Sequence, residues 1–209
     1  ELGMSIFGAL EDAITGKLEY KGRQRPRFKN SSEAIKAGVF YSSEDRKRYG
    51  LVLTSDIAYN ASLSSLDKYI NSGLFINRDK EYGKVKEMVK KLRIKTPSIL
   101  QRAGNLSGGN QQKVCLAKAL MTEPKVLILD EATRGIDIGA KTEIYQLINQ
   151  MAEQGIAVIM ISSELPEILG MSDRIYVMRE GRISAEFDNS ARNITQEDVA
   201  LAATGGVTT

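Results

Sequence analysis

The 209-residue chain contains no histidine, no tryptophan and a single cysteine, Cys115. Without histidine it lacks the most common general base and the most common metal ligand. Catalysis, if the chain supports any, must therefore use carboxylates, backbone amides and cations. A lone cysteine excludes a disulfide framework within the chain, which fits a reducing compartment. No apolar run approaches the roughly 20 residues that a membrane-spanning helix needs, so we expect any membrane role to come through a partner.

The remaining composition is that of an ordinary globular protein. Hydrophobic residues make up 42% of the chain and charged residues 26%, which is enough apolar material for a substantial core. The length suits one large domain, or one domain with a subdomain. A net charge of +3 is too small to indicate a nucleic-acid-binding protein by itself.

The first half of the chain divides into two regions of different character. Residues 51–100 are rich in serine and asparagine and then in lysine, and Val85, Met88 and Leu92 recur at helical spacing. We therefore predict an inserted helical subdomain over 51–100. Residues 1–50 predict a helix over 2–10 and a small strand or hairpin in 17–29 that turns at Gly22. A second helix is predicted through Ala34 and Ile35, capped by Ser31 or Ser32 and stopped at Gly38. A strand over 39–41 and a charged loop over 43–48 follow.

From Asn105 onward the pattern is that of an α/β fold. Apolar runs that suit strands buried on both faces alternate with amphipathic helices, which indicates a largely parallel sheet. The predicted elements are a helix over 109–121 ended by Pro124, a buried strand over 126–129, a helix over 140–153, a second buried strand over 156–161, a helix over 164–169, a final antiparallel hairpin formed by 175–178 and 183–187 with its turn at Glu180-Gly181, and a short helix over 195–201.

Ser107, Gly108 and Gly109 open the helix that ends before Pro124. Free backbone N–H groups at a helix start attract phosphate, and glycine lets an anion approach closely. The same residues also suit an ordinary N-cap, with Gln111 near the capping-box position. A bare Ser-Gly-Gly sequence is more often a cap than a phosphate site, so the local sequence leaves both interpretations open.

Asp130 and Glu131 follow the apolar strand over 126–129. Ligands of open parallel sheets bind beyond the carboxyl ends of the strands. An aspartate there can hold Mg²⁺, which prefers hard oxygen ligands, and an adjacent glutamate can polarise an attacking water. The alternative is that the two acids merely end the strand.

Several motifs, in order and with the right spacing, make the chain resemble the ATP-binding cassette ATPases over nearly its whole length. The segment LSGGNQQKV (106–114) resembles the signature motif of that family, VLILDEA (126–132) its Walker B strand, and TRGIDIGAK (133–141) its D-loop. The wording of these segments and of SEDRKRYGL (43–51) is similar to the second ATPase half of bacterial importers of monosaccharides such as ribose, xylose and galactose.

The resemblance implies a fold and a set of site residues. The fold is a P-loop NTPase-type α/β core over 1–50 and 101–187, with a helical subdomain over 51–100 and a tail over 188–209. ATP and Mg²⁺ are the implied ligands. The implied roles are ATP binding for Ser107, Gly108, Gly109, Gln111 and Asp137, metal binding for Asp130 and Glu44, and catalysis for Glu131 and Ser163.

Two of these positions depart from the wider family. Glu44 stands where a metal-sensing glutamine is usual, and Ser163 where a histidine orients the γ-phosphate. Serine can form hydrogen bonds but cannot act as an imidazole. The chain also contains no G-x-x-x-x-G-K-[ST] phosphate loop, and Glu1-Leu2 resembles the end of one. The resemblance therefore suggests a chain truncated after that loop, which we expect to be inactive alone.

The resemblance also implies partners and a location. These are integral-membrane permease subunits, a first ATPase half and, indirectly, a sugar-binding protein, at the cytoplasmic face of the membrane and without nucleic acid. Two functions stay open on this basis. The chain is either an ATP-hydrolysing half that drives sugar uptake, or an accessory half that supplies only its signature motif to a partner site.

Overall fold

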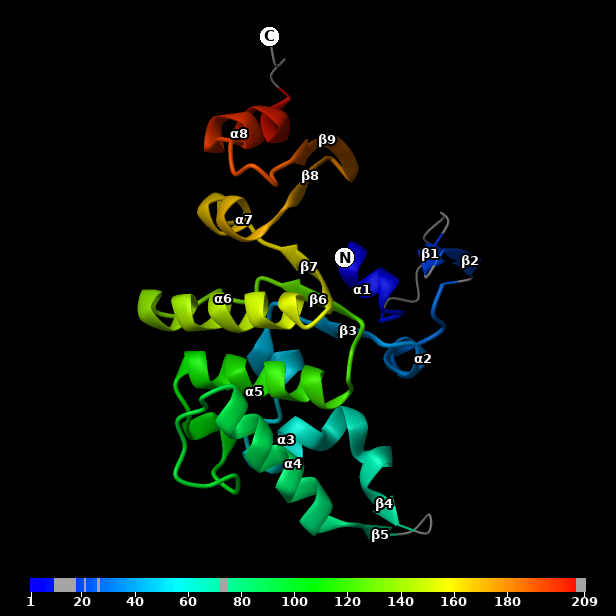
Figure 1. Cartoon of the computed structure of the whole chain (residues 1–209), viewed down its shortest axis with the longest axis vertical. Coiled ribbons are helices and arrows are strands. Elements are labelled where there is room, and N and C mark those ends of the chain that lie inside the picture. The colour runs from blue at the N-terminus through cyan, green and yellow to red at the C-terminus, as the bar shows by residue number, and fades with distance from the viewer. Residues whose placement is uncertain (10–17, 21, 26, 72–74, 206–209) are drawn as a thin grey trace. The chain divides into compact units, whose positions relative to one another are not determined.

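The structure is a computed structural model that describes residues 1–9, 18–20, 22–25, 27–71 and 75–205 (Figure 1). The chain forms two compact units, Glu1–Ile159 and Met160–Thr209. Each unit is described by itself. The predicted division into a core, a helical subdomain and a tail is a different partition of the chain, and it stays a prediction.

A parallel sheet forms the centre of the first unit. Its strands are β3 (Val39–Ser42), β6 (Val126–Asp130) and β7 (Ala157–Ile161), in the order β3-β6-β7. β3 and β6 are parallel, with Val39 opposite Val126 and Ser42 opposite Leu129. Leu127, Ile128 and Leu129 are at most 1% exposed. The predicted α/β class and the buried strand over 126–129 are therefore confirmed.

Strand β7 is less buried than its sequence predicts. We predicted a strand covered on both faces, but Ile159 is 45% exposed and the other residues of β7 are exposed or half-buried. β7 is an edge strand of this sheet, as is β3, but β3 is largely buried, so an edge position alone does not determine the burial of a strand. An apolar run identifies a strand but does not determine how many layers pack against it.

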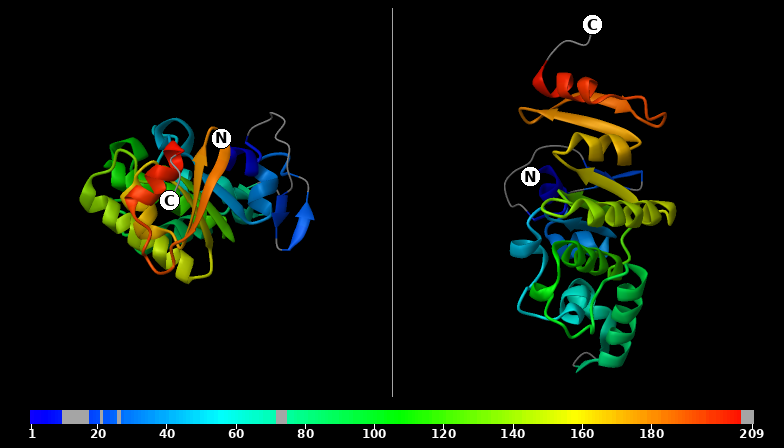
Figure 2. Two further views of the ribbon diagram at one scale, coloured as in Figure 1. Left: turned by 90° about the horizontal axis from the view of Figure 1, so that it is seen from above. Right: turned by 90° about the vertical axis from the view of Figure 1, so that its left-hand side faces the viewer.

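Helix α5 (Gly108–Met121) is the central helix of the first unit. It lies between α6 (Ile138–Glu153) and the pair α3 (Ile57–Ser62) and α4 (Arg78–Lys91), an arrangement seen in two views (Figures 1 and 2). Because it has neighbours on several sides, most of its side chains are buried, including the polar Gln111, Gln112 and Lys113. Helix α6 buries only one face, which consists of the predicted residues Ile144, Leu147, Ile148 and Met151.

The region over 51–100 is mainly helical, as predicted. α3 continues into a 3-10 helix, Leu63–Tyr69, and two short paired strands, β4 (Ile70–Asn71) and β5 (Phe75–Ile76), precede α4. Val85, Met88 and Leu92 are buried. A second 3-10 helix, Ala103–Asn105, leads into α5.

The N-terminal elements agree with prediction in kind but differ in detail. α1 spans Leu2–Ile6 and is shorter than the predicted 2–10, whose last residue lies outside the described part. Strands β1 (Leu18–Tyr20) and β2 (Arg23–Arg25) form the predicted hairpin, with Gly22 at φ 68°, although residues 17, 21 and 26 of the predicted segment are not described.

Two local predictions in this region are wrong. The N-cap of α2 (Ser31–Lys36) is Asn30, whose Oδ1 accepts the Glu33 N–H at 2.9 Å, and not Ser31 or Ser32. The charged loop over 43–48 partly forms a π-helix, Arg46–Gly50, which Asp45 caps by accepting the N–H groups of Lys47 and Arg48.

The second unit is a hairpin covered by helices. It contains α7 (Leu165–Met171), β8 (Arg174–Arg179), β9 (Arg182–Asp188) and α8 (Gln196–Thr204). The predicted turn at Glu180-Gly181 is confirmed, and both residues have positive φ, as the tight turn of a hairpin requires. Ile175, Val177 and Val199 form the buried core of this unit.

Candidate functional site

Ser107 is the N-cap of α5. Its Oγ accepts hydrogen bonds from the Asn110 backbone N–H at 3.5 Å and from the Asn110 side-chain amide at 3.0 Å. The residue is exposed, and the first amides of α5 have no acceptor within the helix. The capping interpretation is therefore correct, and the same geometry leaves a helix start that suits an anion.

The two glycines after Ser107 are needed for close packing. A Cβ atom at Gly109 would lie 2.7 Å from Ala140 Cβ on α6. A Cβ atom at Gly108 would lie 2.9 Å from Nη2 of Arg46 and 3.4 Å from the Gly135 carbonyl oxygen. The glycines thus let α5 approach both α6 and the loop before α6.

Gln111 is buried behind the start of α5. Its side chain is 5% exposed, and its amide nitrogen donates to the carbonyls of Ala103 (3.3 Å) and Leu106 (3.2 Å). These contacts hold the turn that leads into Ser107. Gln111 thus packs against the inner side of the turn formed by Ser107, Gly108 and Gly109, which we call the signature turn.

The carboxyl end of β6 carries Asp130 next to a tyrosine that sequence reasoning missed. The Tyr41 hydroxyl donates to Asp130 Oδ2 at 2.6 Å. Burial, followed by this hydrogen bond, raises the pKa of Tyr41 well above its ordinary value. The parallel pairing of β3 with β6 brings the two residues together, so the only sequence signal was the position of Tyr41 near the end of a strand.

Glu131 has an unusual backbone. Its φ is 47°, in the left-handed region that favours glycine. Such strain in a non-glycine residue is common at functional sites, where the surrounding structure maintains it. The turn that follows Glu131 leads to Asp137, the N-cap of α6, which is exposed and accepts the Ala140 N–H at 2.9 Å.

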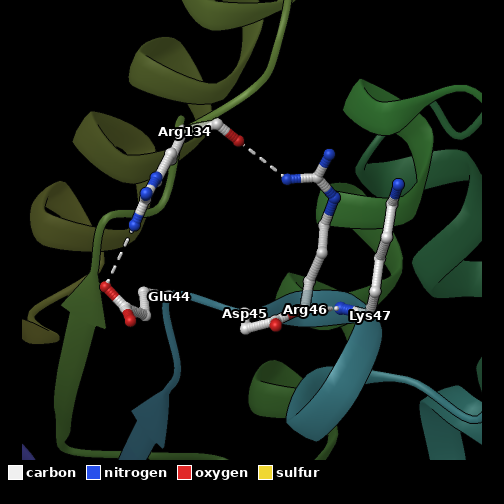
Figure 3. A pocket seen from close by; sticks show the side chains of 5 residues that line it. All are labelled: Glu44, Asp45, Arg46, Lys47 and Arg134. Atoms are coloured by element: carbon white, nitrogen blue, oxygen red, sulfur yellow. Dashed lines mark hydrogen bonds and ion pairs between the residues drawn. The ribbon is translucent and has the colours of Figure 1, made fainter.

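Glu44 lies in a pocket of about 380 Å³ at the end of β3 (Figure 3). Its Oε2 is 3.4 Å from Nη1 of Arg134. The other lining residues are Asp45, Arg46, Lys47 and Arg134. None of these four was predicted as a site residue, although the run of charges directly after a strand was a usable signal.

Ser163 belongs to the second unit, so the structure does not place it relative to Asp130 or Glu131. It is exposed and lies immediately before Glu164, the N-cap residue of α7. The neighbouring Ser162 hydroxyl donates to the buried carboxylate of Glu167 and accepts the Glu164 N–H at 3.1 Å. The loop that carries Ser163 is therefore held by its own unit.

The residues of the first unit fit a magnesium–nucleotide ligand in part. In the described ranges, no three acidic or cysteine side chains gather into a complete metal site. Mg²⁺ is commonly held by only one or two carboxylates together with phosphate oxygens and water. Asp130, fixed by Tyr41, and the half-exposed Glu44 supply suitable hard oxygens. No described helix is long and apolar enough to cross a bilayer.

Comparison with curated proteins finds close relatives. The chain is 52% identical over 206 residues to the xylose import ATP-binding protein XylG of Moorella thermoacetica, covering 99% of the chain and 40% of the relative. It is 48% identical over 206 residues to the ribose import ATP-binding protein RbsA of Caldanaerobacter subterraneus, covering 99% and 41%. The chain thus spans about two fifths of the length of these relatives.

Comparison with solved structures supports the fold. A nucleotide-free ATP-binding cassette from an ABC transporter matches with a TM-score of 0.77 at 22% identity, over 91% of this chain and 76% of that one. The ADP conformation of another such cassette matches with a TM-score of 0.72 at 21% identity, over 97% and 78%. At these identities the likeness concerns the fold alone.

A family comparison agrees with both results. Residues 3–134, which include the signature turn, the strand that ends at Asp130 and the first part of the loop that follows, match the ABC transporter family. This match covers more than half of the chain, and within the structure Gly108 lies against the loop that follows the strand ending at Asp130. The chain therefore belongs to the ABC transporter family, as an ATP-binding cassette.

Proposed function

We propose that the chain is an ATP-binding half of a carbohydrate importer and couples ATP hydrolysis to sugar uptake. The observation that carries this proposal is the joint placement of an exposed signature turn on α5 and of Asp130 and Glu131 at the carboxyl end of β6. The relatives that are named xylose and ribose import ATP-binding proteins support the substrate class.

The proposal extends to the chain's place in a larger assembly. The amino-acid sequences of its motifs support the assignment of this chain as the second ATPase half of such an importer. Permease subunits, a first ATPase half and, indirectly, a sugar-binding protein are the proposed partners, with the protein peripheral at the cytoplasmic side of the membrane.

The exposed signature turn supports a role in a shared site. In this proposal Ser107 and the first amides of α5 face the γ-phosphate of a nucleotide whose phosphate loop belongs to the partner half. These groups stabilise developing charge by hydrogen bonds that are already oriented, with no covalent chemistry. Gly108 and Gly109 keep side chains out of that approach, and Asp137 stands at the same surface at the start of α6.

The second shared site would use the other residues. Asp130 and Glu44 would hold Mg²⁺, which supplies neutralisation of phosphate charge when bound. Tyr41 keeps one oxygen of Asp130 engaged and so fixes the orientation of the carboxylate. Glu131 would orient and polarise the attacking water, and Ser163 would provide a hydrogen bond at the position where a histidine is usual.

A second candidate function is an accessory half that does not hydrolyse ATP at its own site. The serine at position 163 and the glutamate at position 44 favour it, because serine cannot act as an imidazole and the carboxylate of Glu44, although it could still ligate the metal, differs in charge from the usual glutamine. In that case only the signature turn would contribute, and it would act on the partner's nucleotide.

Two substitutions in the full-length importer ATPase separate these functions. If this half is catalytic, Glu131→Gln should lower turnover by about 100-fold or more. If it is accessory, Glu131→Gln should have little effect while Ser107→Arg abolishes turnover. If neither substitution changes the rate of ATP hydrolysis relative to the wild-type protein, both proposals are contradicted.

The 209 residues alone should bind ATP poorly, because their sequence includes no Walker-type phosphate loop. We expect isothermal titration calorimetry with Mg-ATP to detect no binding in the micromolar range. A micromolar affinity for Mg-ATP would mean that residues other than a Walker-type loop bind the phosphates in this chain.

A further inference from the structure

Arg46 is the first residue of the π-helix Arg46–Gly50, which follows Glu44 and Asp45 (together the Glu44 segment). Hydrogen bonds fix the backbone of this turn. Asp45 Oδ1 accepts the N–H groups of Lys47 and Arg48, both at 3.0 Å. The Leu51 N–H donates to the Arg46 carbonyl at 2.8 Å. The Arg46 side chain therefore projects from a turn that three hydrogen bonds hold.

The guanidinium of Arg46 reaches the loop between β6 and α6 (Figure 3). Its Nη1 donates to the Arg134 carbonyl at 2.8 Å and its Nη2 to the Gly135 carbonyl at 3.4 Å. Gly135 has φ 66°, a conformation that glycine adopts without strain. The two carbonyls are thus presented to one planar cation.

The same guanidinium lies against the signature turn. A Cβ atom at Gly108 would be only 2.9 Å from Arg46 Nη2. Arg46 therefore occupies the narrow space between the signature turn and the loop over 131–137, which begins at Glu131 and ends at Asp137. No other contact described above joins these two segments through a charged side chain.

The side chain of Arg134, in the loop over 131–137, makes a second link between this loop and the Glu44 segment. Its Nη1 lies 3.4 Å from Glu44 Oε2, but the two side chains are 67% and 54% exposed. Such an exposed ion pair contributes little. Arg46 instead makes two hydrogen bonds to successive backbone carbonyls of the loop over 131–137, and its guanidinium is the group that also lies against Gly108.

We propose that Arg46 is a positioning residue that keeps the loop over 131–137 at a fixed position relative to the signature turn. The effect on hydrolysis rests on the proposed function, whereas the effect on the two segments does not. Arginine suits this task because its planar fork can donate to two successive carbonyls, whereas a lysine ammonium acts as a point charge. Lysine at position 46 should therefore fail to substitute.

Hydrogen exchange by mass spectrometry on the 209-residue chain tests the positioning itself. We expect Arg46→Met and Arg46→Lys to accelerate exchange of the amides in 107–111 and 131–137 by about tenfold, with the rest of the first unit unchanged. Arg48→Lys is the matched control, because the Arg48 guanidinium instead lies 5.2 Å from the centre of the Tyr49 ring.

Two exchange results would overturn the proposal. The first is unchanged exchange in both segments of the Arg46 variants. The second is a uniform acceleration across the first unit, which would make Arg46 a general structural residue.

Turnover in the full-length importer ATPase provides the second readout. Arg46→Lys should lower kcat by about tenfold or more, with KM for ATP nearly unchanged and Arg48→Lys like wild type. A wild-type kcat in Arg46→Lys would contradict the effect on hydrolysis. If the wild-type protein itself shows no hydrolysis, the proposed function fails, and the exchange experiment still decides the role of Arg46.

Discussion

The two signature glycines have different neighbours. A Cβ atom at Gly109 would meet Ala140 Cβ at 2.7 Å, on a helix that cannot easily move, whereas at Gly108 it would meet the guanidinium at the end of the long Arg46 side chain at 2.9 Å. A family motif therefore contains one glycine required by helix packing and another that leaves room for a cation.

This difference leads to a stability prediction. Gly109→Ala should lower the free energy of unfolding by about 1–3 kcal/mol, because overpacking forces α5 and α6 apart. Gly108→Ala should cost about 1 kcal/mol or less, since alanine favours the helix and a slight displacement of the Arg46 guanidinium relieves the contact. Urea unfolding monitored by circular dichroism measures both, and equal costs would refute the distinction.

Cys115 is 3% exposed, and burial raises the pKa of its thiol from the ordinary 9.0 to about 11. A raised pKa in the folded state means that stability is complete below pH 9 and declines as pH rises from about 9 to 11. The physical reason is that the unfolded chain loses the thiol proton first.

We therefore expect the free energy of unfolding to decline between pH 9 and 10 with a steeper slope in wild type than in Cys115→Ala. Tyr41 and Tyr69, whose pKa values are also raised, contribute mainly above about pH 10. Comparing slopes, not absolute stabilities, removes the cost of the cavity that alanine leaves. Parallel slopes for the two proteins would disprove the assignment.

At the scale of elements, α5 and α6 are joined by a nearly buried cation. Lys113 is 3% exposed and donates to Glu143 Oε2 at 2.5 Å and to the Arg93 carbonyl at 3.1 Å. A lysine inside a signature motif would ordinarily be assigned to solvent or to a phosphate. Here it links α5, α6 and the turn after α4, which the sequence pattern did not indicate.

Glu143→Gln should lower stability by about 1 kcal/mol at pH 7, a modest figure because the Glu143 side chain is 45% exposed. Glu153→Gln, at the exposed end of the same helix, is the matched control and should be nearly neutral. The hydrogen bond from Lys113 lowers the pKa of Glu143. Its contribution is therefore present above about pH 4.5 and is lost as pH falls further, so the two proteins should converge in acid.

Element boundaries were less predictable than element types. The helix over 31–36 was expected, but three adjacent polar residues could cap it, and only the extended backbone of Asn30 selects that residue. The apolar run of β7 was read correctly as a strand and wrongly as a fully covered one. Secondary-structure propensity and hydrophobic periodicity are local properties of the sequence, whereas the burial of a strand's two faces depends on which other elements pack against it.

At the scale of the whole molecule, the chain contains two units of unequal size. The second unit, Met160–Thr209, has a small core around Ile175, Val177 and Val199. A unit of this size buries a smaller fraction of its surface than a large domain does. We therefore expect single core substitutions there to have local effects that are easily measured.

Ile175→Ala should cost about 2–4 kcal/mol and should accelerate hydrogen exchange in β8, β9 and α8, with little change in α5 or β6. Ile183→Ala is the matched control in the same hairpin, because Ile183 is 59% exposed whereas Ile175 is 4% exposed. Equal acceleration in α5 and β6 would show that the two units unfold together.

The sequence by itself determined the α/β class, most of the helices and strands, the family, and where Ser107, Asp130 and Glu131 lie on their elements. These features depend on periodicity, on capping and on short motifs, all of which are local. Only the tertiary structure decided that Tyr41 holds Asp130, that Arg46 holds the loop before α6, and that Gln111 faces inward. Tyr41 and Asp130 are 89 residues apart, and Arg46 and Arg134 are 88 apart. Contacts over such separations exist only after β3 and β6 have paired, so no local pattern encodes them.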